Sequence, residues 1–189
     1  MPEAPPPEDF AARVADVHAA LGLEAVHFAH RCLPLCPEAR TLVVAERGAL
    51  GRDYLLTPAA AGAWQRMKAV AAEQGVEIAI ASAFRSLDHQ ARLVRTKLER
   101  GQCLDEILAV LAPPGYSEHH TGRAVDVSTP GCPLVDEGFE QTAAFVWLAA
   151  HAECFGFTLS YPRDNPWGYI YEPWHWCYTG DGATDETPT

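Results

Sequence analysis

The chain has 189 residues, of which 48% are hydrophobic, and its formal net charge is -11. This length and apolar content suit one compact domain, and the negative charge excludes nucleic acid and anionic membrane surfaces, because both would repel it. No run of residues approaches the roughly 20 apolar positions of a membrane span. The start, MPEAPPPEDF, lacks the basic and then apolar pattern of a secretory signal. We therefore expect a cytoplasmic monomer, or a cell-envelope protein whose export signal was removed.

The two ends of the chain are poorly suited to a core. Residues 1–8 are rich in Pro and Glu, and residues 181–189 are small and polar. We expect both ends to be disordered and a single domain to cover residues 9–180. The six cysteines lack C-x2-C spacing, which argues against a four-cysteine metal site. We expect mostly free thiols, with Cys32 and Cys36 as the pair near enough in sequence to bridge.

Helices dominate the first half of the prediction. Residues 9–21 place apolar side chains on one face at helical spacing, and Gly22 provides a stop. A second helix begins after Thr57, an N-cap followed by proline, and ends at Gly75. Both patterns indicate helices that pack one apolar stripe against a core.

The strands are predicted mainly in the second half. The same patterns predict helices over residues 88–100, 105–112 and 141–155, and strands over residues 76–84, 124–128, 157–161 and 169–178. Helices come first and strands cluster late. This order favours an α+β fold, in which helices pack against a small antiparallel sheet, over a regular alternation of parallel units.

Potential metal ligands lie in two segments. The sequence SEHHTGRAVD places His119 and Asp126 seven residues apart, across a loop that leads into a predicted strand. About fifty residues later, the sequence EPWH supplies Glu172 and His175. Imidazole and carboxylate groups are good zinc ligands, and three protein ligands with one open position is the form of a catalytic zinc site.

Each of these residues also has an ordinary structural explanation. Most histidines are surface residues or satisfied core residues, and we apply that explanation to His18, His27, His30, His89 and His151. An aspartate after a strand of small residues can be a turn residue. Trp174 and Trp176 can be core residues. The individual residues therefore carry little weight by themselves.

Together, the two segments are specific. The pattern S-x-H-x-x-G-x-A-x-D followed by E-P-W-H resembles the VanY-type D-alanyl-D-alanine carboxypeptidases, a family of zinc peptidases, over about residues 57–180. The resemblance implies that His119, Asp126 and His175 bind one zinc ion. Its phasing selects His119 over the neighbouring His120. It also implies a peptidoglycan stem peptide as the substrate.

The resemblance further implies the catalytic groups. It makes Glu172 the catalytic base and Arg85, in the segment SAFRS, the cationic group that faces the reacting carbonyl. Residues i and i+3 face opposite sides of a flat strand, so Glu172 and His175 reach one metal only if the chain bends between them. Pro173 favours such a bend.

A carboxypeptidase must also recognise the free carboxylate at the end of its substrate. Ser117, Gln90 and Tyr161 are the candidates for hydrogen bonds to that group. Trp174, together with neighbouring aromatic residues, is expected to wall the cleft and exclude water, although core packing would explain these residues equally well.

Two departures from the family pattern and several alternatives remain. Ala83 stands where a glycine is common, and Cys177 stands where a basic residue is common. The motifs do not separate a D,D-carboxypeptidase from an L,D-carboxypeptidase or a D-Ala-D-Ala dipeptidase. Related endopeptidases usually carry Asp at the position of Glu172, which ranks them lower. A zinc-containing binding module without turnover is the alternative from another class, and Glu172 argues against it.

Overall fold

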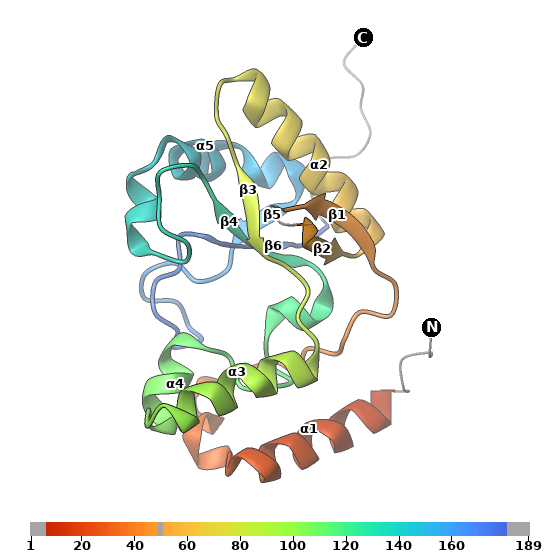
Figure 1. The fold of residues 1–189 in the computed structure, drawn as a ribbon, viewed down its shortest axis with the longest axis vertical. Helices are drawn as coiled ribbons and strands as arrows, with labels where there is room; N and C mark the ends of the chain where they lie inside the picture. The colour runs from red at the N-terminus through yellow and green to blue at the C-terminus, as the bar shows by residue number, and fades with distance from the viewer. Residues whose placement is uncertain (1–6, 49–50, 181–189) are drawn as a thin grey trace.

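The computed structural model describes residues 7–48 and 51–180 (Figure 1). An antiparallel sheet of order β3-β4-β6-β5 is built from β3 (Ala79–Ser82), β4 (Ala124–Ser128), β5 (Phe157–Leu159) and β6 (His175–Tyr178). A second sheet pairs β1 (Val43–Arg47) with β2 (Asp53–Leu56). The antiparallel strands confirm the predicted α+β class. The disorder expected for residues 1–6 and 181–189 concerns positions outside the described residues.

Five α-helices lie in the described part of the chain. They are α1 (Pro7–Leu21), α2 (Pro58–Glu73), α3 (Leu87–Glu99), α4 (Leu104–Val110) and α5 (Ala143–His151). Short 3-10 helices cover Ala25–His27, Ala29–Arg31, Glu118–Thr121, Glu137–Gln141 and Ala152–Phe155. The starts follow local chemistry: Thr57 precedes a proline at the first turn of α2, and the Ser86 side chain accepts a hydrogen bond from the His89 N–H at the start of α3. No helix in this part of the chain is long and apolar enough to cross a membrane.

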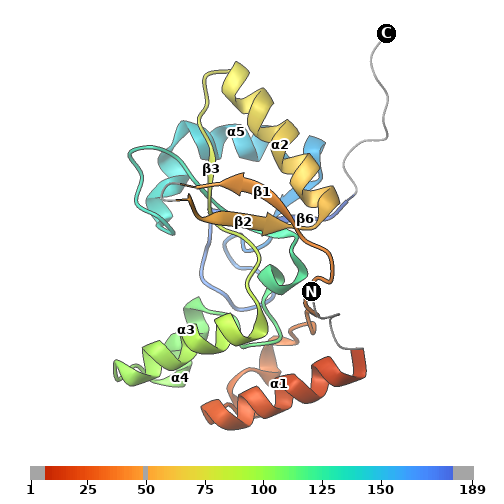
Figure 2. The same ribbon diagram turned by 45° about the vertical axis from the view of Figure 1, so that its right-hand side comes forward.

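The helices form two groups around the sheet (Figures 1 and 2). Helices α2 and α5 pack on the four-stranded sheet through a core that includes Trp64, Met67 and Val125. Helices α1, α3 and α4 lie on the other side of the molecule with apolar clusters of their own, which include Val94. Each large apolar side chain buried in this way contributes roughly 1.5–3 kcal/mol. A cavity of about 520 Å³ lies between the sheet and the second group of helices, and its lining includes residues of β3, β4, α3 and α4.

Several element boundaries differ from the prediction. The strand expected over residues 169–178 begins only at His175, because Pro173 and Trp174 form a turn before it. The helix expected over residues 141–155 is α only from Ala143 to His151, with 3-10 turns on either side. The strand expected over residues 76–84 is confined to β3. Helix α1 begins at Pro7, within the start that was expected to be disordered.

Two further features concern the first part of the chain and the cysteines. The pairing of β1 with β2 was not predicted. All six cysteines are free in the structure, including Cys32 and Cys36, in agreement with the expectation of free thiols.

Candidate metal centre and active site

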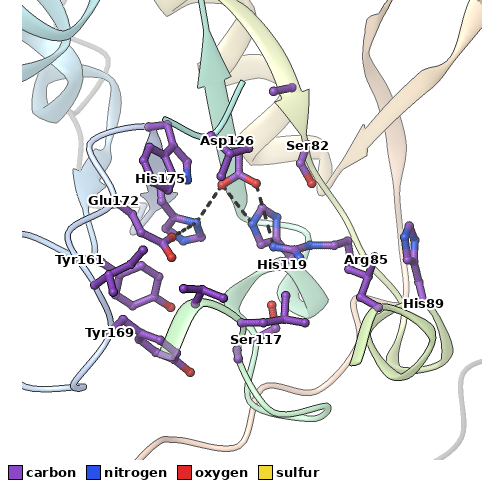
Figure 3. A pocket seen from close by; sticks show the side chains of 18 of the residues that line it. Ser82, Arg85, His89, Ser117, His119, Asp126, Tyr161, Tyr169, Glu172 and His175 are labelled. Carbon is purple, nitrogen blue, oxygen red and sulfur yellow. Dashed lines mark hydrogen bonds and ion pairs between the residues drawn. The ribbon is translucent and has the colours of Figure 1, made fainter. Parts of the chain in front are cut away.

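Strand pairing brings two of the predicted ligands together. Asp126 in β4 pairs directly with His175 in β6, and residues opposite each other in an antiparallel pair project from the same face of the sheet. His119 arrives from the 3-10 helix Glu118–Thr121, immediately before β4. Its backbone carbonyl accepts a hydrogen bond from the Arg85 N–H at 3.1 Å, which ties the helix to the segment between β3 and α3. Figure 3 shows the three side chains converging from these separate elements.

The structure explains why the first motif contains a glycine, Gly122. It ends the 3-10 helix with a φ of +64°, a left-handed conformation that favours glycine. A Cβ atom at this position would also lie 2.8 Å from a methyl group of Leu42. The turn that aims His119 towards Asp126 therefore favours glycine, chiefly because of its left-handed backbone conformation.

The three side chains form a compact, buried cluster. Oδ1 of Asp126 lies 3.0 Å from Nδ1 of His175 and 3.3 Å from Nε2 of His119. The ligand atoms of the three residues all lie within 4.8 Å of one another, and all three residues are buried. Within the described ranges this is the one group of at least three His, Cys, Asp or Glu side chains close enough to hold a metal ion.

His119 has the protonation state of a metal ligand. Its Nδ1 lies 2.7 Å from the Ala83 carbonyl oxygen, so Nδ1 carries the proton and donates it there. Burial lowers the pKa of His119 to about 4, and the positive charge of Arg85 acts in the same direction. The Nε2 lone pair therefore faces the Asp126 carboxylate, buried and without a hydrogen-bond partner. This juxtaposition of two electron-rich groups fits a cation placed between them.

The remaining charges of the cluster also fit a cation. Burial acts to lower the pKa of His175, but hydrogen bonds to Asp126 and Glu118 outweigh it and raise the pKa to about 10. Burial opposes ionisation of Asp126, yet the hydrogen bond with His175 and the positive charge of His175 hold its pKa well below the ordinary value. The buried carboxylate thus requires a positive partner. A proton on His175 provides it in the absence of metal, and a divalent cation would replace that proton.

Glu172 reaches the cluster because the chain bends, as predicted. The His175 N–H donates to the Glu172 carbonyl oxygen at 3.0 Å, which closes a turn through Pro173. The turn places Oε2 of Glu172 3.8 Å from Nδ1 of His175, inside the cavity. Burial raises the pKa of Glu172 to about 7. A carboxyl group with such a pKa can accept and release a proton near neutral pH.

Arg85 lies on the other side of the cluster (Figure 3). Its Nη2 is 4.0 Å from Oδ2 of Asp126, and its side chain lines the cavity. Burial lowers the pKa of Arg85 while the charges of Asp126 and Glu172 act to raise it. An arginine remains charged under such conditions. The structure therefore presents a fixed cation and a carboxyl group to the same cavity.

Three of the four residues predicted to contact substrate line the cavity, and the fourth does not. Ser117, Tyr161 and Trp174 line the cavity, and the Tyr161 ring lies 4.6 Å from the His175 ring. Gln90 does not line it. Its side chain is fully buried, and Nε2 donates to the Ala112 carbonyl oxygen at 2.7 Å, so the structure does not support the predicted contact with substrate. Helix α3 turns Gln90 towards α4 rather than towards the metal cluster.

The selection of His119 over His120 agrees with the geometry. Nδ1 of His120 lies 2.6 Å from the Arg85 carbonyl oxygen, and Nε2 accepts a hydrogen bond from the Gly115 N–H at 3.0 Å. Burial lowers the pKa of His120, so its ring is neutral and both nitrogens are occupied by the backbone. His120 therefore fastens the loop that carries His119 and has no nitrogen left for a metal.

Glu118 and Tyr169 belong to the site but were missed in the sequence. Oε2 of Glu118 lies 3.0 Å from Nε2 of His175 and accepts a 2.6 Å hydrogen bond from Ser160. Tyr169 lines the cavity, with its ring 4.7 Å from that of Tyr161. The position of Glu118 beside His119 in the motif was the available signal. For Tyr169 the sequence offers none, because its role depends on the loop before β6.

A small antiparallel sheet that presents two histidines and an aspartate at one buried point defines a metal-binding α+β domain. The chain belongs to the VanY family, described as D-alanyl-D-alanine carboxypeptidase, whose family model matches residues 53–181. This match covers more than half of the chain and contains all residues of the metal cluster. It agrees with the resemblance inferred from the two motifs.

Relatives and solved structures agree with this assignment. The chain is 36% identical over 131 residues to YodJ of Bacillus subtilis (strain 168), covering 66% of this chain and 46% of that protein. It thus spans about half the length of this curated relative. The structure of the LD-carboxypeptidase LdcB is similar with a TM-score of 0.67 and 30% identity, covering 75% of this chain and 69% of LdcB.

A second solved structure is that of a mutant of the vancomycin resistance D,D-pentapeptidase VanY in complex with Zn(II). Its TM-score is 0.57 and its identity 25%, covering 77% of this chain and 87% of the VanY chain. The fold that carries the His, Asp and His cluster here is therefore shared with a protein that holds zinc.

Proposed function

We propose that this chain is a zinc-dependent carboxypeptidase that removes the terminal D-Ala residue of peptidoglycan stem peptides ending in D-Ala-D-Ala. The observation that carries the proposal is the cluster of His119, Asp126 and His175, whose ligand atoms lie within 4.8 Å of one another. Membership of the VanY family indicates the class of bond. All three ligands come from one chain, which supports a monomer as the catalytic unit.

In this proposal His119, Asp126 and His175 hold one zinc ion. A bound zinc ion polarises the scissile carbonyl group and lowers the pKa of a coordinated water molecule towards about 7. Glu172 accepts the proton of the attacking water and then donates it to the departing amine, which must leave in protonated form. Its burial in the cavity wall and its pKa near 7 support both transfers.

In this proposal the guanidinium group of Arg85 stabilises the negative charge that develops on the scissile carbonyl oxygen. The carbonyl oxygen becomes negative as water attacks, and a preorganised donor at that point lowers the barrier. The side chain of Arg85 is 16% exposed and faces the cavity beside Asp126, which supports this role. Ser117 and Tyr161 line the same cavity and are the proposed donors to the free carboxylate of the substrate.

One alternative has a specific observation in its favour. LdcB, an LD-carboxypeptidase, is similar to this chain at a TM-score of 0.67, so removal of D-Ala from a tetrapeptide by the same residues is the second candidate. A D-Ala-D-Ala dipeptidase with the same site is less favoured, because the 520 Å³ cavity continues along α3 beyond the metal cluster. A non-catalytic zinc module has no use for the carboxyl group of Glu172 beside an open metal position.

Turnover assays test the proposal. The zinc-loaded protein is incubated with stem peptides that end in D-Ala-D-Ala or in a single D-Ala, with and without a chelator. We expect faster release of D-Ala from the first peptide and loss of activity with the chelator. Faster cleavage of the second peptide would select the L,D alternative. Absence of cleavage of both peptides would overturn the proposed function.

A further inference from the structure

The cavity extends away from the metal cluster along α3. Arg85, which approaches Asp126, directly precedes this helix, so the metal cluster lies near its N-terminal end. His89, Leu93 and Lys97 all line the cavity, and their spacing of four residues places them in one row on the helix. At a rise of 1.5 Å per residue, the row from His89 to Lys97 is about 12 Å long. Figure 1 shows α3 next to α4 in the lower part of the molecule, apart from the sheet.

The charge of this row contrasts with the charge of the chain. The net charge is -11, yet the side chains of Arg52, Arg85 and Lys97 all line the same cavity. Arg85 lies beside Asp126, but neither Arg52 nor Lys97 has a carboxylate partner within 4.0 Å in the described part of the chain. The pKa of His89 is lowered by burial and by nearby arginines that include Arg85 and Arg52. The lining of the cavity thus includes two cations, Arg52 and Lys97, without anionic partners in the described part of the chain.

A carboxypeptidase substrate has one residue on one side of the cleaved bond and the rest of the peptide on the other. The long part of the cavity must therefore receive the residues that precede the cleaved bond. An extended peptide advances about 3.3 Å per residue, so 12 Å accommodates about three or four residues. A side-chain carboxylate on a residue bound beside the far end of this row would reach Lys97.

We propose that the end of the cavity lined by Lys97 binds a carboxylate of the substrate about three residues before the cleaved bond. This inference rests on the proposed function, because it takes the metal cluster as the point of cleavage. It names the substrate class as D-Ala-ended peptides that are anionic in their preceding part. A neutral dipeptide would fill the metal end alone and leave the cations without a partner.

Two synthetic peptides of equal length test the inference. Both end in D-Ala-D-Ala, and they carry either Glu or Gln as the third residue before the cleaved bond. The kcat/KM of each peptide is measured with the zinc-loaded parent, with Lys97→Gln and with Arg95→Gln. Arg95 is the matched control, because it is an exposed cation of the same helix that does not line the cavity.

We expect the parent to prefer the Glu peptide by about 3- to 5-fold at low ionic strength, the range of a solvent-accessible ion pair. Lys97→Gln should bring the two peptides close to equality, and Arg95→Gln should keep the preference. Salt at about 0.5 M should reduce the preference of the parent, since it screens accessible charges. Equal kcat/KM values for the two peptides in the parent, or an unchanged preference in Lys97→Gln, would overturn the inference.

A separate measurement distinguishes failure of this inference from failure of the proposed function. Calorimetric titration of zinc-loaded Glu172→Gln protein with each peptide gives the ratio of the two Kd values without turnover. If the parent cleaves neither peptide, the proposed function fails, and the inference about the anion is then judged on this ratio. A ratio near 1 would overturn it by itself.

Discussion

Oε2 of Glu118 lies 3.0 Å from Nε2 of His175. Glu118 does not line the cavity, so its carboxylate contacts the imidazole on the side away from substrate. Ser160 donates to the same oxygen at 2.6 Å and fixes the position of the carboxylate. The Nε2–H of His175 therefore donates to Glu118, and Nδ1, which faces Asp126, is the nitrogen left for a metal.

Replacement of Glu118 by Ala should weaken zinc binding. Partners of this kind orient a ligating histidine and raise its basicity, and their loss typically costs about 10- to 100-fold in metal affinity. Glu118→Gln should retain part of the affinity, because the amide oxygen still accepts the hydrogen bond. Competition of each variant with a chelator measures the change, with Glu73→Gln, an exposed position in α2, as the control. Parent-like affinity in Glu118→Ala would show that the contact has no role in holding the metal.

The two adjacent histidines should respond differently to substitution. His119→Ala should lose zinc, since two remaining ligands hold the metal far more weakly than three. His120→Ala should keep one zinc per chain but lower the free energy of unfolding by about 1–3 kcal/mol, because it leaves buried backbone groups of Arg85 and Gly115 without partners.

Metal analysis and denaturant unfolding of the metal-free proteins distinguish these effects. A zinc content near zero in His120→Ala, with the fold intact, would contradict the assignment of ligands. So would full zinc occupancy in His119→Ala. The pair provides matched controls, since the two residues are neighbours in one 3-10 helix and both are buried.

Substitution of Arg85 should affect catalysis more than metal binding. Arg85→Ala is expected to retain zinc and to lower kcat by about 10²- to 10³-fold, the usual effect of removing one donor to a developing oxyanion. Arg85→Lys should recover only part of the loss, because an ammonium group lacks the planar donor geometry of guanidinium. Steady-state kinetics with metal analysis tests both variants. A parent-like kcat in Arg85→Ala would exclude a role at the reacting carbonyl.

The resemblance of the two motifs to the VanY family implied the metal ligands, and the structure shows that their geometry depends on three short segments. His119 is aimed by a turn that requires Gly122, Asp126 follows from strand alternation, and Glu172 reaches His175 through the turn at Pro173. Helix starts were predictable because the side chain and proline that define them lie within four residues.

Features that depend on distant contacts could not be predicted. Gln90 does not line the cavity, and its amide donates to the carbonyl oxygen of Ala112, a residue that the packing of α4 places there. Strand β1 was not predicted, because Glu46 within it interrupts the apolar pattern of the sequence. Its carboxylate accepts hydrogen bonds from the Trp64 indole, the Lys68 ammonium group and the Ile80 N–H, partners 18 to 34 residues away. Such a polar contact inside a fold leaves no periodic signal.

The assignment of Glu172 as base predicts that binding and catalysis can be separated within the EPWH segment. His175→Ala should lose both zinc and activity, since it removes one of three ligands. Glu172→Gln should keep full zinc occupancy, because amide and carboxylate have nearly the same shape and Glu172 lies 3.8 Å from the nearest ligand atom of His175. Its kcat should fall by at least the roughly 10²- to 10⁴-fold typical of general acid-base catalysis, while substrate affinity survives. Zinc analysis, calorimetry with the D-Ala-D-Ala-ended peptide and single-turnover kinetics measure these three properties separately.

If Glu172→Gln turned over substrate near the parent rate with full zinc occupancy, another group would have to carry the proton. Glu118 would not be that group, because it lies outside the cavity.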